Sequence, residues 1–317
     1  MSCESIKKLE GLLRRSIQLR VENIKNGPTV NWKYHSNLAI LFSGGIDCTL
    51  IARIVHDIID PDQSVDLLNV AFQNPRIHGK TQSGDAFDNS AYEACPDRIT
   101  GRRSLAELQR VCIGRRWQFV EINVKYSETQ AHRAAVMSLM HPHKTEMDLS
   151  IANALYFAAR GVGIIRDAHD RNIISPYTTQ ARVLLSGLGA DEIFGGYQRH
   201  ATAYSRSKFE GLFNELELDI NRLGKRNLGR DDRVISHWGR EVRYPYLDEK
   251  LLSWALAAPV SEKMGFGEEE LSYIKSFTQR QGVTDTGFIE PGKKALRLLA
   301  LKLGMKEASM AKKRAVS

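Results

Sequence analysis

The stretch Leu38-Ala39-Ile40-Leu41-Phe42-Ser43-Gly44-Gly45-Ile46-Asp47-Cys48 decides the fold of this 317-residue chain. Its first five residues are apolar, a run too short for a helix and typical of a strand buried on both faces of a parallel sheet. Ser43-Gly44-Gly45 then predicts a turn, and apolar residues recur at helical spacing over residues 49–59. A strand, a glycine turn and a helix in this order predict an anion site, because the first N–H groups of a helix have no intrahelical partner.

The chemistry of this turn goes beyond its glycines. A bare Gly-Gly turn is more simply interpreted as a feature of backbone geometry alone. Here Asp47 offers a carboxylate to a phosphate-bound metal ion, and Ser43 adds a hydroxyl beside the backbone amides. The order of residues is neither that of a Walker loop nor that of a dinucleotide-binding turn. We therefore predict a polyphosphate site of another type.

Composition limits the class of protein. Hydrophobic residues make up 42% of the chain and charged residues 26%, which is typical of a globular protein. No apolar run approaches the roughly 20 residues of a membrane span, and the first ten residues are too polar for a signal peptide. The four cysteines are scattered without a C-x-x-C pair, so we expect neither a zinc site nor disulfides. We predict a cytoplasmic protein that does not contact membranes.

The formal net charge of +8 suits a polyanionic ligand such as ATP as well as a nucleic acid. The basic residues occur in short, separated groups, and no aromatic residues alternate with them to form a base-stacking platform. We therefore expect solvent-exposed helix faces and disfavour a nucleic-acid partner.

Alternating strand and helix patterns follow the first loop and predict an α/β fold with a parallel sheet and helices on both faces. Strands are predicted at residues 65–72, 117–124 and 182–185, and helices at residues 5–25, 99–111, 127–140 and 144–161, with Asp148 as a helix N-cap. Beyond residue 197 only helices are predicted, at residues 210–223, 230–238, 247–256 and 293–303. We therefore divide one domain of residues 1–317 into a leading helix (1–37), an α/β nucleotide-binding core (38–197) and a mainly helical carboxyl-terminal layer (198–317).

A second strand-end loop repeats the first. The strand at residues 182–185 runs into Ser186-Gly187-Leu188-Gly189-Ala190-Asp191-Glu192. The carboxyl ends of parallel strands face one crevice, so Asp47 and Asp191 are expected on either side of one polyphosphate, jointly holding Mg²⁺. A third segment, residues 227–248, is dense in charge and can be a solvated network or a site for a small zwitterion.

These three segments, with Glu241-Val242-Arg243-Tyr244-Pro245-Tyr246-Leu247-Asp248 as the last, resemble the synthetase domain of the asparagine synthetase family. That family belongs to the N-type ATP pyrophosphatases, which cleave ATP to AMP and pyrophosphate on an adenine nucleotide alpha hydrolase-like fold. The resemblance covers residues 38–258, and residues 66–72, 96–102 and 226–235 resemble one subgroup of the family more closely.

The resemblance implies roles for single residues. It implies that ATP is bound by Leu41, Ser43, Gly44, Gly45, Asp47, Cys48, Phe72, Ser186 and Gly187. It implies that Asp47 and Asp191 bind Mg²⁺ and act in catalysis together with Lys313. It implies that the second substrate is contacted by Asp148, Glu192, Asp232, Arg233 and Arg243.

The implied reaction is that of a carbon–nitrogen ligase in asparagine biosynthesis. An aspartate carboxylate attacks the α-phosphorus of ATP, and an amine then attacks the acyl-adenylate. Leu188 stands where the family has a glutamate tied to this aminolysis, and Cys48 replaces a phosphate-contacting serine.

Only 42 residues precede Ser43, too few for the family's glutaminase half. We therefore expect ammonia rather than glutamine as the nitrogen donor of this chain alone, or a separate glutaminase subunit. The alternative hypothesis is a catalytically degenerate nucleotide-binding domain that acts through protein partners.

Overall fold

Seven strands form one sheet in the order β5-β4-β3-β2-β1-β6-β7. The structure is a computed structural model that describes residues 3–24, 36–75, 90–167, 173–267 and 289–312. The strands are β1 (Leu38–Leu41), β2 (Val65–Phe72), β3 (Trp117–Val124), β4 (Val162–Arg166), β5 (Ile174–Thr178), β6 (Val183–Leu185) and β7 (Glu241–Arg243). Neighbouring strands are parallel, except that β4 is antiparallel to β3 and β5 is antiparallel to β4.

Helices follow most strands. The α-helices are α1 (Cys3–Val21), α2 (Ile46–Ile58), α4 (Ser90–Glu93), α5 (Pro96–Val111), α6 (Tyr126–Met140), α7 (Glu146–Arg160), α8 (Ala190–Phe194), α9 (Gln198–Arg222), α10 (Gly229–Ser236), α11 (Glu249–Ala257), α13 (Lys294–Lys302) and α14 (Lys306–Met310). A π-helix, η1 (Leu223–Leu228), joins α9 to α10, and the 3-10 helices η2 (Pro245–Leu247) and η3 (Val260–Glu262) flank α11.

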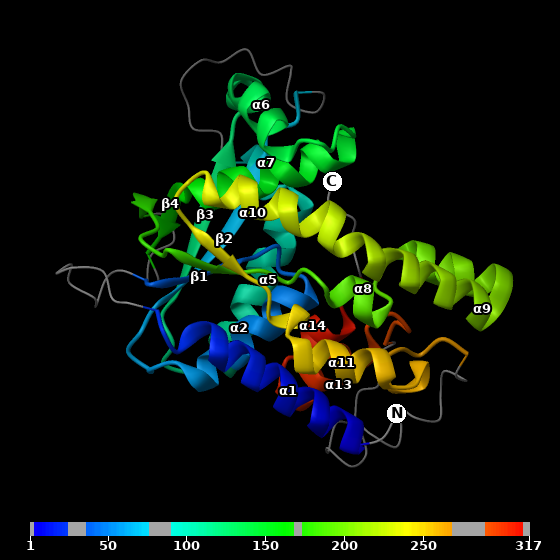
Figure 1. Cartoon of the computed structure of the whole chain (residues 1–317). Helices are drawn as coiled ribbons and strands as arrows, with labels where there is room; N and C mark the ends of the chain where they lie inside the picture. Colours follow the sequence, from blue (N-terminus) through cyan, green and yellow to red (C-terminus); the bar gives the residue numbers. More distant parts are fainter. Residues whose placement is uncertain (1–2, 25–35, 76–89, 168–172, 268–288, 313–317) are drawn as a thin grey trace.

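The sheet lies between two helical layers. Leu38 and Ile40 pack into one buried cluster with residues of α1, α2, α5 and α13, whereas Ala39 between them packs into a second cluster with residues of α6, α7 and α10. This is the alternation expected of a strand buried on both faces. Figure 1 shows the two layers, with α6, α7 and α10 above the sheet and α1, α2 and α13 below it. The predicted α/β class with helices on both faces is confirmed.

The position of β1 determines where a ligand can bind. β1 pairs with β2 on one side and with β6 on the other, so the chain order reverses at this strand. Open parallel sheets bind ligands at such a switch point, at the carboxyl ends of the strands. The loops after β1 and β6 therefore begin side by side at one edge of the sheet, as their sequences predicted.

Two parts of the sheet differ from the prediction. We predicted only helices beyond residue 197, but β7 lies in that region and pairs with β6 in parallel. It has three residues, two of them charged, so its side chains carry no periodic apolar signal. The β4–β5 pair was not predicted either, because β4 is only half-buried over most of its length, and β5 is largely exposed and contains Pro176, a residue type confined to edge strands.

Two helices also begin differently from the prediction. α2 begins at Ile46, three residues before the predicted start, so Asp47 lies in its first turn. Asp148 is not the N-cap of α7: the cap is Thr145, whose hydroxyl oxygen accepts a hydrogen bond from the Asp148 backbone N–H. In the part of the chain that the structure describes, no helix is both long enough and apolar enough to cross a membrane.

Candidate functional site

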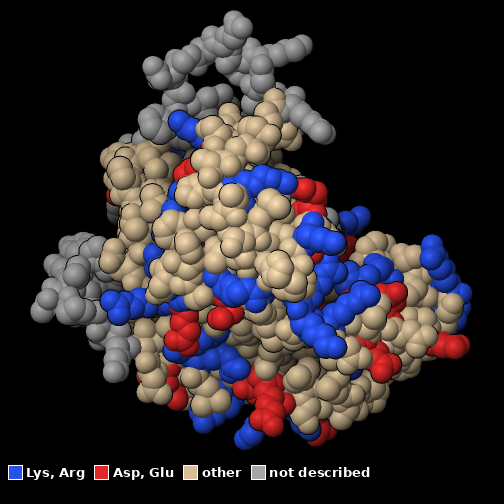
Figure 2. All heavy atoms as spheres, turned by 45° about the horizontal axis from the view of Figure 1, so that its top comes forward, with Lys and Arg blue, Asp and Glu red and all other residues tan. Residues whose placement is uncertain are grey.

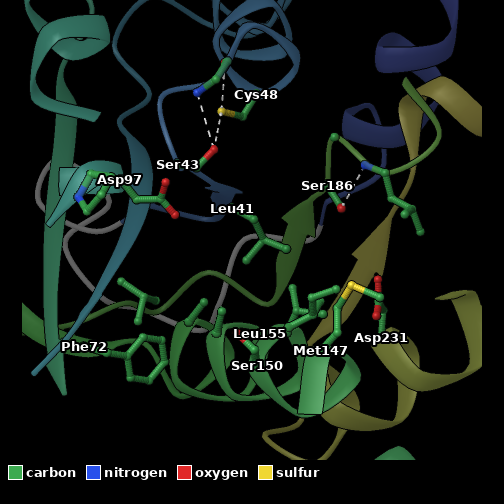
Figure 3. Close-up of a pocket in the computed structure, with 18 of the residues that line it drawn as sticks. Leu41, Ser43, Cys48, Phe72, Asp97, Met147, Ser150, Leu155, Ser186 and Asp231 are labelled. Carbon is green, nitrogen blue, oxygen red and sulfur yellow. Dashed lines mark hydrogen bonds between the residues drawn. The ribbon is translucent and has the colours of Figure 1, made fainter. Parts of the chain in front are cut away.

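A cavity of about 1100 Å³ opens at the carboxyl ends of strands β1, β2 and β6. Figure 3 shows Leu41 and Ser43 on one side of it, and Met147, Ser150 and Leu155 of α7 on the other. At one end its lining is apolar on both sides, with Leu41, Leu68, Val70, Phe72, Ile151 and Leu155. The opposite end is lined by the two glycine loops and by charged residues of α7, α8 and α10. A cavity with an apolar slot beside polar loops suits a nucleotide, whose base is flat and whose phosphates are charged.

The two strand-end loops have the same local structure. The Ser43 hydroxyl accepts a hydrogen bond from the Gly45 N–H at 3.4 Å, and the Ser186 hydroxyl accepts one from the Leu188 N–H at 3.2 Å (Figure 3). Each is a serine turn closed two residues later, and each leads into a helix with an aspartate in its first turn. The loops also approach closely, since a Cβ on Gly187 would lie 2.9 Å from Asp47 Cβ.

A lysine from a distant part of the chain joins the loops. The ammonium nitrogen of Lys293 lies 2.6 Å from Asp47 Oδ2 and 2.8 Å from Asp191 Oδ1. Burial opposes the charged ammonium, but the two carboxylates raise the pKa of Lys293 above its ordinary value. The two predicted metal ligands are therefore close enough to share one cation.

The loop after β1 is supported from behind by α5. Ser104 Oγ donates to the Gly44 carbonyl at 2.7 Å, and Gly44 has a φ of 82°, with no room for a side chain against the backbone of Thr100. The Asn69 side-chain amide donates to the Phe42 carbonyl at 2.9 Å, and its Oδ1 accepts from the fully buried Arg98 at 2.7 Å. The loop geometry is therefore determined by contacts that the motif does not contain.

Arginines balance the acidic residues at the α7–α10 end of the cavity. Arg226 and Arg230 contact Asp148 at 3.1 and 2.8 Å, and Arg230 also contacts Asp231 at 2.7 Å. Burial alone would raise the pKa of Asp148, but hydrogen bonds from Arg226 and Thr145 lower it. Burial raises the pKa of Asp231 to about 6 despite Arg230. Figure 3 shows Asp231 beside Met147 at this end.

Glu192 stands apart from these pairs. It is 2% exposed and lines the cavity, where its Oε1 accepts hydrogen bonds from Tyr197 Oη at 2.6 Å and from Asn227 Nδ2 at 3.2 Å. Its Oε2 is buried and has no hydrogen-bond partner among the described residues. Burial and the neighbouring Asp191 raise the pKa of Glu192. Buried polar atoms are normally satisfied, so this oxygen is a candidate ligand contact.

Cys48 faces its own loop. Its Sγ lies 3.2 Å from the Gly45 carbonyl oxygen, to which it donates, and 3.8 Å from Ser43 Oγ. Burial and the nearby Asp47 raise the pKa of this thiol to about 11. The thiol is therefore protonated at neutral pH and has no enhanced nucleophilic character.

Most of the sequence-predicted site residues meet at the cavity. Those that line it are Leu41, Ser43, Gly45, Asp47, Cys48, Phe72, Asp148, Ser186, Gly187, Asp191 and Glu192, with Gly44 packed behind the loop.

Three predicted substrate residues are not among the lining residues. Arg233 donates to the carbonyls of Leu139 and His141, and Arg243 donates to Glu241 and to the Arg20 carbonyl. Asp232 is exposed. Lys313 lies outside the described residues.

Sequence reasoning missed several residues of the site. Lys293 looked like one of many paired lysines, and nothing in Lys293-Lys294 indicates which of the two is directed at the loops. Tyr197, Asn227 and Arg230 lay inside motifs or charged segments, but no pattern indicated that they contact Glu192 or Asp148. Except for Tyr197, which is five residues from Glu192, these residues are far from their partners in the sequence, so spacing along the chain carries no signal for their contacts.

The surface around the cavity is basic in part. Figure 2 shows Lys and Arg side chains gathered where α10 runs toward α9. Arg199, Arg222 and Arg226 line the cavity in this region. Such a rim attracts polyanionic ligands.

Comparison with known proteins agrees with these features. Residues 171–215 and 210–271 match the family model described as Asparagine synthase. Asparagine synthetase domain-containing protein 1 of Mus musculus is 38% identical over 304 residues, which cover 89% of this chain and 45% of the mouse protein. The protein of the same name from Bos taurus is 35% identical over 347 residues, which cover 99% of this chain and 51% of the bovine protein.

This chain belongs to the asparagine synthase family. The family resemblance predicted from the three motifs is thus confirmed. A shorter match, 47% identical over 83 residues, is to Putative asparagine synthetase (glutamine-hydrolyzing) 1 of Methanocaldococcus jannaschii, and covers 26% of this chain and 15% of that protein. The chain spans about half the length of the first two relatives.

The site residues fit the magnesium ion that the family typically binds with ATP. Asp47 and Asp191 supply hard carboxylate oxygens, and their contacts with Lys293 place both within reach of a single cation. Mg²⁺ is commonly held by one or two carboxylates, with phosphate oxygens and water completing its coordination. No cluster of three or more His, Cys, Asp or Glu side chains suited to a metal occurs among the described residues.

Proposed function

We propose that this chain binds ATP with Mg²⁺ and adenylates a carboxylate, with release of pyrophosphate. One observation carries the proposal: carboxylates from two neighbouring strand-end loops, Asp47 and Asp191, converge on one cation at the switch point of the sheet. In that position they would hold Mg²⁺, which would neutralise the charge of the phosphates when bound.

The apolar slot and the loops suit different parts of the nucleotide. The adenine would lie against Leu41 and Phe72, and the phosphates would accept hydrogen bonds from the backbone of the loops that begin at Ser43 and Ser186. A substrate carboxylate oxygen then bonds to the α-phosphorus while the bond from that phosphorus to the pyrophosphate oxygen breaks. Positioning and electrostatics supply most of the catalysis in such a transfer.

The second substrate is proposed to be an amino acid, with aspartate the first candidate. Glu192 would accept hydrogen bonds from its ammonium group, since Oε2 is buried and unsatisfied among the described residues and no described basic side chain pairs with this carboxylate. An ammonium would supply both the missing hydrogen bond and the missing positive charge.

Amine attack on the adenylate is the less supported half of the reaction. Leu188, which belongs to the second loop, lines the cavity and cannot take or relay a proton. We therefore propose adenylation as the chemistry of this chain, with ammonia as the donor if an amide is formed. A degenerate domain that acts through partners is the competing hypothesis.

Pyrophosphate release tests the proposal directly. Purified protein is incubated with ATP and Mg²⁺, with and without aspartate, and released pyrophosphate is measured by a coupled assay. We expect aspartate-dependent release that falls at least about 100-fold in Asp191→Asn, because one of two metal ligands is lost. Asp62→Asn removes an exposed carboxylate and serves as the control. Equal release by wild type and Asp191→Asn would contradict adenylation at this site.

A further inference from the structure

Lys293 has an unusual place in this molecule. Its side chain is 5% exposed, and its ammonium contacts one carboxylate from each loop. The residue immediately precedes α13, more than one hundred residues after Asp191 in sequence. Two carboxylates and one ammonium carry a net charge of −1, so the lysine is the resident counter-ion of both loops.

The backbone conformation of Lys293 is strained. Lys293 has a φ of 59°, in the left-handed region that non-glycine residues seldom occupy. Its N–H donates to the Phe194 carbonyl at 2.8 Å. A Cβ on Gly196 would overlap both Lys293 Cε and Asp191 Oδ1, so the lysine chain passes through space that only glycine leaves open. The surroundings therefore direct this side chain at the two carboxylates.

We infer that Lys293 positions Asp47 and Asp191 before the metal arrives and occupies the place of that metal, so that Mg²⁺ enters only together with the nucleotide. The inference rests on the proposed function, because it takes these aspartates as metal ligands. A free divalent ion must displace an ammonium that has two partners, which leaves the buried ammonium without an anion. Nucleotide phosphates offer the displaced ammonium new acceptors, and the exchange then becomes favourable.

Metal binding without nucleotide distinguishes this role from a merely structural one. Mn²⁺ replaces Mg²⁺ as a paramagnetic probe, and free Mn²⁺ is measured by electron paramagnetic resonance with the full chain. Lys293→Met removes the charge. Lys293→Gln also removes it but keeps hydrogen-bond donors for the carboxylates, and is the second variant should the first fail to fold. Lys293→Arg keeps the charge, and Lys302→Met breaks a lysine–carboxylate pair elsewhere on α13, with Glu10 at 2.6 Å.

We expect Lys293→Met and Lys293→Gln to bind Mn²⁺ at least about tenfold more tightly than the wild type, since the two carboxylates lose the ammonium that contacts both of them. Lys293→Arg and Lys302→Met should bind it as weakly as the wild type. Adding Asp191→Asn to the Lys293→Gln variant should abolish the gain.

The inference is overturned if a folded Lys293→Gln variant binds Mn²⁺ no more tightly than the wild type. Because no ATP is present, this result does not depend on catalysis. Pyrophosphate release with unchanged Mn²⁺ affinity would refute only the role of Lys293. A gain in Mn²⁺ affinity without any pyrophosphate release by the wild type would support that role and refute the proposed function.

Discussion

Two acidic groups in the same cavity differ in how their charge is balanced. Asp47 and Asp191 share the ammonium of Lys293, which comes from the same chain. Glu192, the residue after Asp191, accepts only two neutral hydrogen bonds, from Tyr197 and Asn227, and one of its oxygens is buried without a partner among the described residues.

This difference indicates which kind of cation each acidic group can bind. Charged side chains are seldom buried without a partner, because desolvation of the charge costs several kcal/mol. The first group already has a cation that a divalent ion can replace. The second group has no cation among the residues that the structure describes, and its charge can be balanced by the cationic part of a ligand. In the proposed function, the metal and amino-acid sites would therefore lie on consecutive residues of α8.

The largest expected effect on pyrophosphate release comes from displacing the Asp191 and Lys293 side chains without removing a charge. Gly196→Ala places a Cβ against Asp191 Oδ1 and Lys293 Cε and forces them apart. We expect pyrophosphate release to fall about 100-fold, because small misplacements of positioning groups cost that much. The matched control is Gly11→Ala, since nothing lies within 4 Å of a Cβ built there. Unchanged release in Gly196→Ala would show that the spacing of these side chains is unimportant.

The second prediction concerns the charge of Glu192, which a substitution to glutamine removes. Glu192→Gln keeps the size and the hydrogen-bonding capacity of the side chain but cannot pair with an ammonium. We expect KM for the amino-acid substrate to rise about 10- to 100-fold, since hydrogen bonds to charged groups contribute about 1.5–3 kcal/mol. KM for ATP should stay within about twofold. Steady-state kinetics with each substrate varied in turn measures both, and an equal rise in both values would argue against an ammonium site.

The third prediction concerns pH. The pKa of Glu192 is raised by burial, and only its ionised form attracts an ammonium. The affinity for the amino acid should therefore increase as pH rises through that elevated pKa and decrease below it, by about tenfold per pH unit at most. The same titration of KM in Glu192→Gln should lose this step. A step that persists in the variant would have to be assigned to another group, such as Asp231.

The smallest expected effect concerns Cys48. Its thiol donates to the Gly45 carbonyl, and its pKa is about 11. Cys48→Ser replaces a weak donor by a stronger one at the helix start, so ATP should bind about two- to fivefold more tightly. Isothermal titration with ATP and Mg²⁺ measures the change, and the wild type should show no loss of affinity after mild oxidant treatment. A large drop in affinity in Cys48→Ser would mean that sulfur has a specific role.

Local patterns predicted the elements that carry strong periodic signals. β2 and β3 have the predicted bounds, and both glycine loops were identified because a buried strand that ends in Ser-Gly is visible in the sequence. β7 and the β4–β5 pair were missed, since short or exposed strands have no apolar periodicity of their own. Asp148 was assigned to the wrong helix position because Thr145, three residues earlier, caps α7 equally well in sequence terms.

The sequence by itself determined the α/β class, the two strand-end loops and the pair of aspartates within them, because these depend on residues adjacent in the chain. Only the tertiary structure decided which other residues join them. Lys293 reaches both loops, Glu192 has no cationic partner in the described part of the chain, and Arg230 neutralises Asp148, whereas Arg233 and Arg243 bond to backbone carbonyls elsewhere. The physical reason is that charge balance in a cavity depends on distances in space, which the order of residues does not specify.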